Sequence, residues 1–186
     1  MGKLVPIAPL GGLEPQIDRV GGVVISEVTD RALASVSCRM GRDAGFALAI
    51  EKLCGIAAPG PGKSAAGASY TLYWTGPGQW FSEAPFASHE DIAARMKAVL
   101  GAEASVTEQS DAWARFRIEG GPVVAMMQRL CGVDSAAMAA GDVTRSMIEH
   151  LGSLVIRTKT GFEILCPRSG AGSLHHALVG AAKSVA

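Results

Sequence analysis

The sequence predicts an α+β fold made of two copies of one supersecondary unit. Residues 28–39 return 78 positions later as residues 106–117, and Leu53-Cys54-Gly55 returns 77 positions later as Leu130-Cys131-Gly132. Residues 72–85 align with residues 154–167, 82 positions later and without a gap. Three recurrences in the same order indicate a duplication, and a duplicated unit constrains the fold before any motif is considered.

Strands open each copy. Residues 1–22 are rich in Gly and Pro and predict an irregular arm, and residues 23–28 are a β-branched run that predicts a strand. Residues 35–40 then alternate, with Val36, Cys38 and Met40 on one face. In the second copy Ala114, Phe116 and Ile118 alternate with Arg115 and Arg117. A period of two is typical of a half-buried strand.

A helix follows in each copy. The apolar residues recur at the spacing of one helical face; they are Phe46, Ala49, Ile50 and Leu53 in the first copy, and Val123, Met126, Met127 and Leu130 in the second. Pro122 suits the first turn of the second helix, where no N–H donor is needed. Gly55 and Gly132 predict the helix ends, because glycine adopts the left-handed closing conformation.

A strand pair and a second helix complete each copy. The pairs span residues 70–85 and 154–167, with turns at 76–78 and 159–161, and an extra strand is expected at 143–150. Residues 57–69 leave open whether the first copy has a counterpart. Ser88 and Ser169 are the expected N-caps of the closing helices. Their apolar stripes are Ile92, Met96, Val99 and Leu100, and Leu174, Leu178, Ala181 and Val185.

The order β–α–β–β–α predicts a ferredoxin-like arrangement in each copy, with antiparallel sheets and helices on one face. The domain organisation expected from the sequence is an arm at residues 1–22, a first repeat at 23–101 and a second repeat at 102–186. At 186 residues, the two halves are expected to form one compact domain.

Composition argues against several functional classes. Seventeen basic residues balance seventeen acidic ones, so nothing attracts nucleic acid or an anionic membrane. No apolar run reaches the ~20 residues of a membrane span. No signal peptide is recognisable, and the four cysteines show no C-x-x-C pattern, so reduced thiols in the cytoplasm are expected. Near neutrality and a positive mean hydropathy favour a subunit that buries surface in a partner; self-association of the isolated chain stays open.

Residues 57–64 match a relaxed phosphate-loop pattern, with Ala57 in place of the first glycine. A phosphate loop needs a preceding strand and a following helix, whose N–H groups converge on phosphate. In this chain the order is reversed, and two prolines remove N–H donors. We therefore interpret the stretch as a connector and disfavour a nucleotide hydrolase.

Candidate ligand-binding residues are few. Arg168, Ser169 and Ser173 place a guanidinium and two hydroxyls at a helix start, where they could hold a carboxylate or phosphate; a simple cap beside a solvated arginine is the alternative. Adjacent His175 and His176 point about 100° apart on a helix, so no metal site is expected. The three tryptophans suit a core, an interface or a flat apolar ligand slot. No catalytic residue is predicted, and the two copies share no polar cluster that could be a paired site.

Several motifs together resemble the gamma subunit of heterotetrameric sarcosine oxidase. They are Leu130-Cys-Gly-Val-Asp134, residues 141–151 from Gly141-Asp-Val-Thr144 to Leu151, residues 162–174 including Cys166-Pro-Arg168-Ser169, and Gly76-Pro-Gly-Gln-Trp80-Phe81. The resemblance covers roughly residues 20–186. The same subunit type occurs in related N-methyl-amino-acid oxidoreductases such as N-methylglutamate dehydrogenase, which is one alternative.

The resemblance implies a fold similar to the folate-binding domain of the glycine-cleavage T-protein. It implies a complex that oxidises sarcosine to glycine and passes the one-carbon unit to tetrahydrofolate. The alpha and beta subunits would hold FAD, FMN, NAD and tetrahydrofolate, and the delta subunit zinc. The gamma subunit would be a non-catalytic scaffold packed against alpha. A free-standing folate-binding module is the second alternative, although the chain is about half the length expected of a complete folate-dependent transferase.

Overall fold

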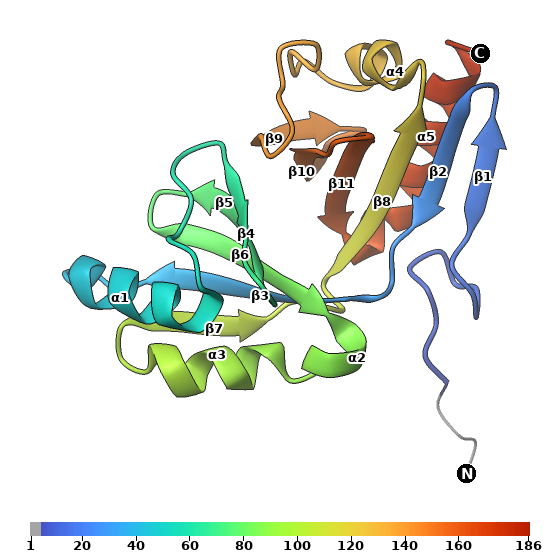
Figure 1. Cartoon of the computed structure of the whole chain (residues 1–186). Helices are drawn as coiled ribbons and strands as arrows, with labels where there is room; N and C mark the ends of the chain where they lie inside the picture. The colour runs from blue at the N-terminus through green and yellow to red at the C-terminus, as the bar shows by residue number, and fades with distance from the viewer. Residues whose placement is uncertain (1–4) are drawn as a thin grey trace. The chain divides into compact units, whose positions relative to one another are not determined.

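The computed structural model describes residues 5–186, and two compact units make up this part of the chain. The first unit contains the described residues up to Thr29, together with Asp111–Ala140 and Thr144–Ala186. The second unit contains Asp30–Ser110 and Gly141–Val143. Each unit consists of one antiparallel sheet with its helices (Figure 1).

The first unit is built on a six-stranded sheet in the order β1-β2-β8-β11-β10-β9. Its strands are β1 (Ile17–Val20), β2 (Val23–Glu27), β8 (Trp113–Gly120), β9 (Val143–Ile148), β10 (Leu151–Arg157) and β11 (Gly161–Pro167). Helices α4 (Val123–Leu130) and α5 (Ala171–Lys183) pack on one face, and a short 3-10 turn, η1 (Arg168–Gly170), leads into α5. The core joins Phe116, Phe162 and Ile164 of the sheet to the two helices.

The second unit has a five-stranded sheet in the order β4-β5-β6-β3-β7. Its elements are β3 (Arg31–Cys38), α1 (Asp43–Cys54), β4 (Ser64–Ala66), β5 (Thr71–Gly76), β6 (Gln79–Pro85), α2 (Phe86–His89), α3 (Ile92–Leu100) and β7 (Ala104–Glu108). The sheet contributes small side chains to the core, such as Ala34 and Ala84, and the helices contribute Phe46, Ile50 and Met96. Strand β4 answers the open question about residues 57–69.

Strand register defines how the two copies correspond. Arg31 pairs with Pro85 in β3 and β6, and Trp113 pairs with Pro167 in β8 and β11. Both strands are therefore displaced by 82 positions, and the sequence alignment of residues 28–39 with 106–117, at 78, is wrong for the first strand. The error has a physical origin: 78 and 82 differ by an even number, and a period-two pattern is unchanged by an even shift.

One strand of each sequence copy lies in the sheet of the other. Strand β2, from the first copy, pairs with β8 of the second, with Ile25 opposite Ile118. Strand β7, from the second copy, pairs with β3 of the first, with Val36 opposite Val106. The compact units and the sequence copies at residues 23–101 and 102–186 are thus different divisions of the chain.

Three features of the arm and the first copy differ from the sequence prediction. Within the arm, Ile17–Val20 form strand β1; residues 1–4 lie outside the described part. The strand was missed because the backbone ladder to β2 forms it, and Asp18 and Arg19 interrupt any apolar alternation. Met40 is fully exposed at 101%, because β3 ends at Cys38 and the chain turns at Gly41. Val99 is also exposed.

The sequence predicted a glycine at the end of two helices, and the prediction is confirmed for one of them. Gly55 closes α1 with φ of 71°, as predicted, whereas α4 ends on an extended Cys131 and Gly132 lacks a positive φ. Ser88 lies inside α2 and Ser169 inside η1, so neither is an N-cap. The N-cap of α3 is Asp91 and that of α5 is Gly170.

Within residues 5–186, no helix combines the length and hydrophobicity that a membrane crossing requires.

Candidate functional site

The predicted anion-binding residues lie at the start of α5. The Arg168 guanidinium donates a hydrogen bond to the Ile7 carbonyl oxygen at 2.6 Å, and a second nitrogen lies 3.8 Å from the Asp111 carboxylate. Ser169 and Ser173 are exposed. Arg168 therefore holds the N-terminal arm against the first unit, and anion binding by this group stays a prediction.

A buried carboxylate that the sequence patterns did not predict holds the same arm. Glu27 is only 6% exposed. Its Oε1 accepts the Leu10 N–H at 2.9 Å, and its Oε2 accepts the Gln16 N–H at 2.7 Å. The signal was available in the sequence: Val23, Ile25 and Glu27 share one face of β2 by strand alternation. A glutamate on that apolar face has to find donors, because an unsatisfied buried carboxylate is costly.

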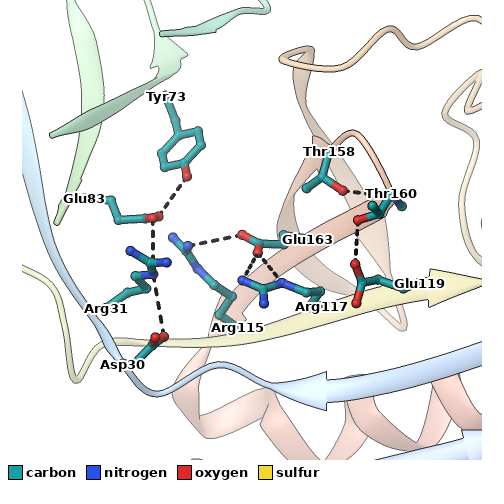
Figure 2. Close-up of polar contacts among 11 residues, drawn as sticks. Asp30, Arg31, Tyr73, Glu83, Arg115, Arg117, Glu119, Thr158, Thr160 and Glu163 are labelled. Atoms are coloured by element: carbon teal, nitrogen blue, oxygen red, sulfur yellow. Dashed lines mark hydrogen bonds and ion pairs between the residues drawn. The ribbon is translucent and has the colours of Figure 1, made fainter. Parts of the chain in front are cut away.

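The first unit carries a charged cluster on the sheet face opposite α4 and α5. Arg117 and Glu163 are cross-strand partners in β8 and β11, and Arg117 donates to the carboxylate from Nε at 2.9 Å. Arg115 donates to the other oxygen of Glu163 at 3.2 Å (Figure 2). Arg115 and Glu163 are both buried. A buried pair of this kind contributes little to net stability, because desolvation offsets much of the attraction.

The second unit carries a comparable cluster on the face of its sheet that points away from its helices. Tyr73 donates its phenolic O–H to Glu83 at 2.8 Å. Arg31 lies 3.8 Å from the same carboxylate and 3.6 Å from Asp30 (Figure 2). Glu83 is buried. By register Glu83 corresponds to Leu165 rather than to Glu163, so the two clusters are displaced by two residues along equivalent strands.

The two clusters occupy non-equivalent positions, so the expectation that the copies share no polar cluster able to form a paired site stays a prediction. Each unit places an arginine and a glutamate on the same face of the same strand pair. Figure 2 also shows the turn between β10 and β11, where Thr160 donates to Glu119 and Thr158 accepts the Gly161 N–H. Each of these contacts joins strands or turns of a single unit, so each has a structural role in its own sheet.

An Asp–His pair links β1 to α5. The Asp18 carboxylate lies 2.7 Å from His175 Nε2, and Gln16 donates to the same oxygen at 2.9 Å. The hydrogen bond with His175 holds the pKa of Asp18 below its ordinary value, against an opposing effect of burial. His176, next along the helix, is exposed. Within residues 5–186 no three His, Cys, Asp or Glu side chains gather as metal ligands would.

The relaxed phosphate-loop segment forms a connector held by neighbouring groups. Lys63 forms an ion pair with Asp142, and the Ser64 N–H donates to the Gly141 carbonyl oxygen. No helix follows, because Ser64 begins β4. Trp80 stacks on Phe46 with ring centroids 5.0 Å apart and donates its indole N–H to the Pro59 carbonyl. Trp80 is therefore a packing residue of the second unit.

Comparisons with known proteins identify solved structures that have the same fold as this chain. No protein-family model and no curated protein matches the sequence. The heterotetrameric sarcosine oxidase from Corynebacterium sp. U-96, solved in complex with pyrrole 2-carboxylate, matches with a TM-score of 0.78 and 18% identity, over 91% of this chain and 88% of that chain. The glycine cleavage system aminomethyltransferase T from Bartonella henselae matches with a TM-score of 0.66 and 15% identity, over 83% of this chain.

Both structures share this fold. The predicted α+β architecture of duplicated ferredoxin-like units, similar to the folate-binding domain of the glycine-cleavage T-protein, is confirmed. The chain spans only 44% of the aminomethyltransferase chain. At such identities the likeness establishes the fold alone.

Proposed function

We propose that this chain is the gamma-type subunit of a heterotetrameric complex that oxidises sarcosine to glycine and transfers the one-carbon unit to tetrahydrofolate. One observation carries the proposal. The match to the sarcosine oxidase structure covers 91% of this chain and 88% of the other, so most of each chain takes part in it. The sequence motifs at β9, β11 and η1 support the same assignment.

The role we propose is a non-catalytic scaffold. Polar groups of the first unit with structural contacts support it: buried Glu27 and half-buried Arg168 hold the arm, and buried Glu163 joins two strands. In this proposal FAD, FMN, NAD, tetrahydrofolate and zinc belong to the partner subunits. The alpha subunit is the main contact, with beta and delta completing the complex. A cytoplasmic location is part of the same proposal, supported by the four free cysteines.

Co-expression tests this function. The chain is produced with candidate alpha, beta and delta chains from neighbouring genes, a tag on beta is used for purification, and native mass spectrometry gives the composition. We expect one copy of each subunit and sarcosine-dependent oxygen consumption. Assays with N-methylglutamate beside sarcosine separate the related dehydrogenase. Recovery of a stable, fully active alpha–beta enzyme without this chain would contradict the proposal.

The second candidate is a free-standing folate-binding module. The specific observation in its favour is the TM-score of 0.66 to the aminomethyltransferase. Titration of the isolated chain with tetrahydrofolate, followed by tryptophan fluorescence and calorimetry, separates the two. A module of this class gives saturable binding, whereas absence of heat and of a fluorescence change at millimolar ligand removes it.

A further inference from the structure

Exposed apolar side chains are concentrated in the N-terminal arm, the segment that comprises residues 5–17. Among residues 5–186, nine large apolar side chains are exposed, and four of them lie in this arm. They are Val5 at 59%, Ile7 at 54%, Leu13 at 71% and Ile17 at 59%. The same thirteen residues contain a single ionisable side chain, Glu14. The arm therefore presents a nearly uncharged apolar surface.

The arm is held in this conformation by one buried and one half-buried group of the first unit. Both oxygens of Glu27 accept backbone N–H groups of the arm, and Arg168 donates to the Ile7 carbonyl. Ala8 is buried, and Leu10 packs against the core. Pro6, Pro9 and Pro15 restrict the backbone further. These contacts hold the arm on the first unit while its four large apolar side chains stay exposed.

A fixed apolar segment is typical of a docking element. Exposed apolar patches of a few hundred Å² mark interaction surfaces on soluble proteins. A segment already ordered in the free chain loses less conformational entropy on binding, which favours affinity. The Glu27 carboxylate is buried, and Glu14 is the single ionisable side chain of the arm, so the outward surface of the arm complements an apolar, uncharged partner.

We propose that the arm inserts into an apolar, uncharged groove of a larger partner subunit of the complex. This inference rests on the proposed function and identifies the contacting segment. The area of the arm's exposed side chains distinguishes between two binding partners, a second copy of the arm and a groove in a larger subunit. Four side chains offer a few hundred Å², below the ~800 Å² that each partner of a stable interface buries. Two arms facing each other would thus be too small for a homodimer, whereas a groove that surrounds the arm buries several of its sides.

The test compares substitutions inside and outside the arm. The double variant Leu13→Ser/Ile17→Ser removes apolar surface without touching Glu27 or Arg168. The control Leu48→Ser/Met147→Ser makes the same chemical change at two side chains that are exposed at 73% and 59% elsewhere. Each full-length chain is co-expressed with the partner subunits, and its retention on tagged beta is measured. We expect at least a tenfold loss of retention for the arm variant and none for the control.

A third variant tests the fixing group. Glu27→Gln keeps the shape of the side chain but replaces one carboxylate oxygen by an NH₂ group. That group cannot accept a hydrogen bond, so either the Leu10 or the Gln16 N–H loses its acceptor. We expect faster amide hydrogen exchange at Leu10 and Gln16 in the isolated chain, together with reduced retention. Unchanged exchange at both amides would overturn the role of Glu27. Circular dichroism of all variants verifies the fold.

The outcomes separate this inference from the proposed function. If the wild-type chain is retained and the arm variant is retained equally, the arm proposal is overturned and the subunit proposal stands. If the wild-type chain is not retained, the subunit proposal fails and the arm proposal falls with it. Light scattering that shows a homodimer lost in the arm variant, or arm-dependent sedimentation with phosphatidylcholine vesicles, would assign the surface to another occupant and overturn the inference.

Discussion

Ser82 is a buried polar residue in an apolar setting. Its side chain is fully buried in β6, cross-strand from Ala34 and Leu72, and its hydroxyl has no hydrogen-bond partner among the described residues. The corresponding position in the first unit, by register, is Ile164. An unsatisfied buried hydroxyl destabilises the folded state by about 1–3 kcal/mol.

Replacing Ser82 by alanine is therefore expected to raise the free energy of unfolding by about 1 kcal/mol, since the desolvation penalty disappears and little volume is lost. Urea denaturation measures the change. Ser153→Ala is the matched control, because that buried hydroxyl donates to the Leu151 carbonyl; this variant should lose stability. A destabilised Ser82→Ala would contradict the expectation.

Two thiols provide a second prediction at the residue scale. Burial raises the pKa of Cys54 and of Cys166 from 9.0 to about 11. The unfolded chain ionises these thiols at a lower pH than the folded chain does, so the free energy of unfolding should fall as the pH rises from 9 toward 11.

In the native state a thiol reagent should modify half-buried Cys38 and Cys131 before buried Cys54 and Cys166. Mass spectrometry after timed labelling checks the order, and early modification of Cys166 would refute it.

At the scale of elements, the spacing of apolar residues correctly predicted the buried face of each element. The sequence patterns did not predict the element ends reliably. Phe46 and Ile50, or Met126 and Met127, lie on the buried faces that their spacing predicts. Contacts outside each element occur at the ends: the Arg168 N–H, at the start of the 3-10 turn, donates to the Ala112 carbonyl oxygen in a distant segment. No local capping pattern encodes that contact.

The Asp18–His175 contact between β1 and α5 predicts a pH dependence. The pKa of Asp18 is lowered in the folded state, so the unfolded chain binds its proton first as the pH falls. The stabilising contribution is present above the ordinary pKa of 3.8 and is lost as the pH falls through the lowered pKa. Unfolding measured from neutral pH into this acidic range checks it. The stability of Asp18→Asn should approach that of the wild-type chain at low pH; a constant difference would contradict the assignment.

On the scale of the whole molecule, the exchange of β2 and β7 links the two sequence copies. Each central strand, β3 or β8, takes one neighbour from the other copy. Val106 of β7 contributes to the core of the second unit, and Ile25 of β2 to that of the first. A chain divided at the sequence boundary separates each strand from its sheet.

Fragments 1–101 and 102–186 should therefore be largely unfolded when they are produced separately, and should fold when mixed. Neither fragment can complete its sheet or close its core alone, and buried apolar surface is the main source of folding free energy. Circular dichroism and NMR spectra of each fragment and of the mixture check this. Two independently folded fragments whose spectra sum to that of the intact chain would contradict it.

The sequence by itself determined the α+β class, the duplication and the core faces, because alternation and helical periodicity are local and each copy repeats them. The holding of the arm by Glu27 and Arg168 was decided by tertiary structure, since these hydrogen bonds join residues that are 17 and 161 positions apart in the chain. The exchange of β2 and β7 was decided there too. A strand's periodicity records which face is buried, and strand pairing is set by backbone groups that are the same in every residue except proline.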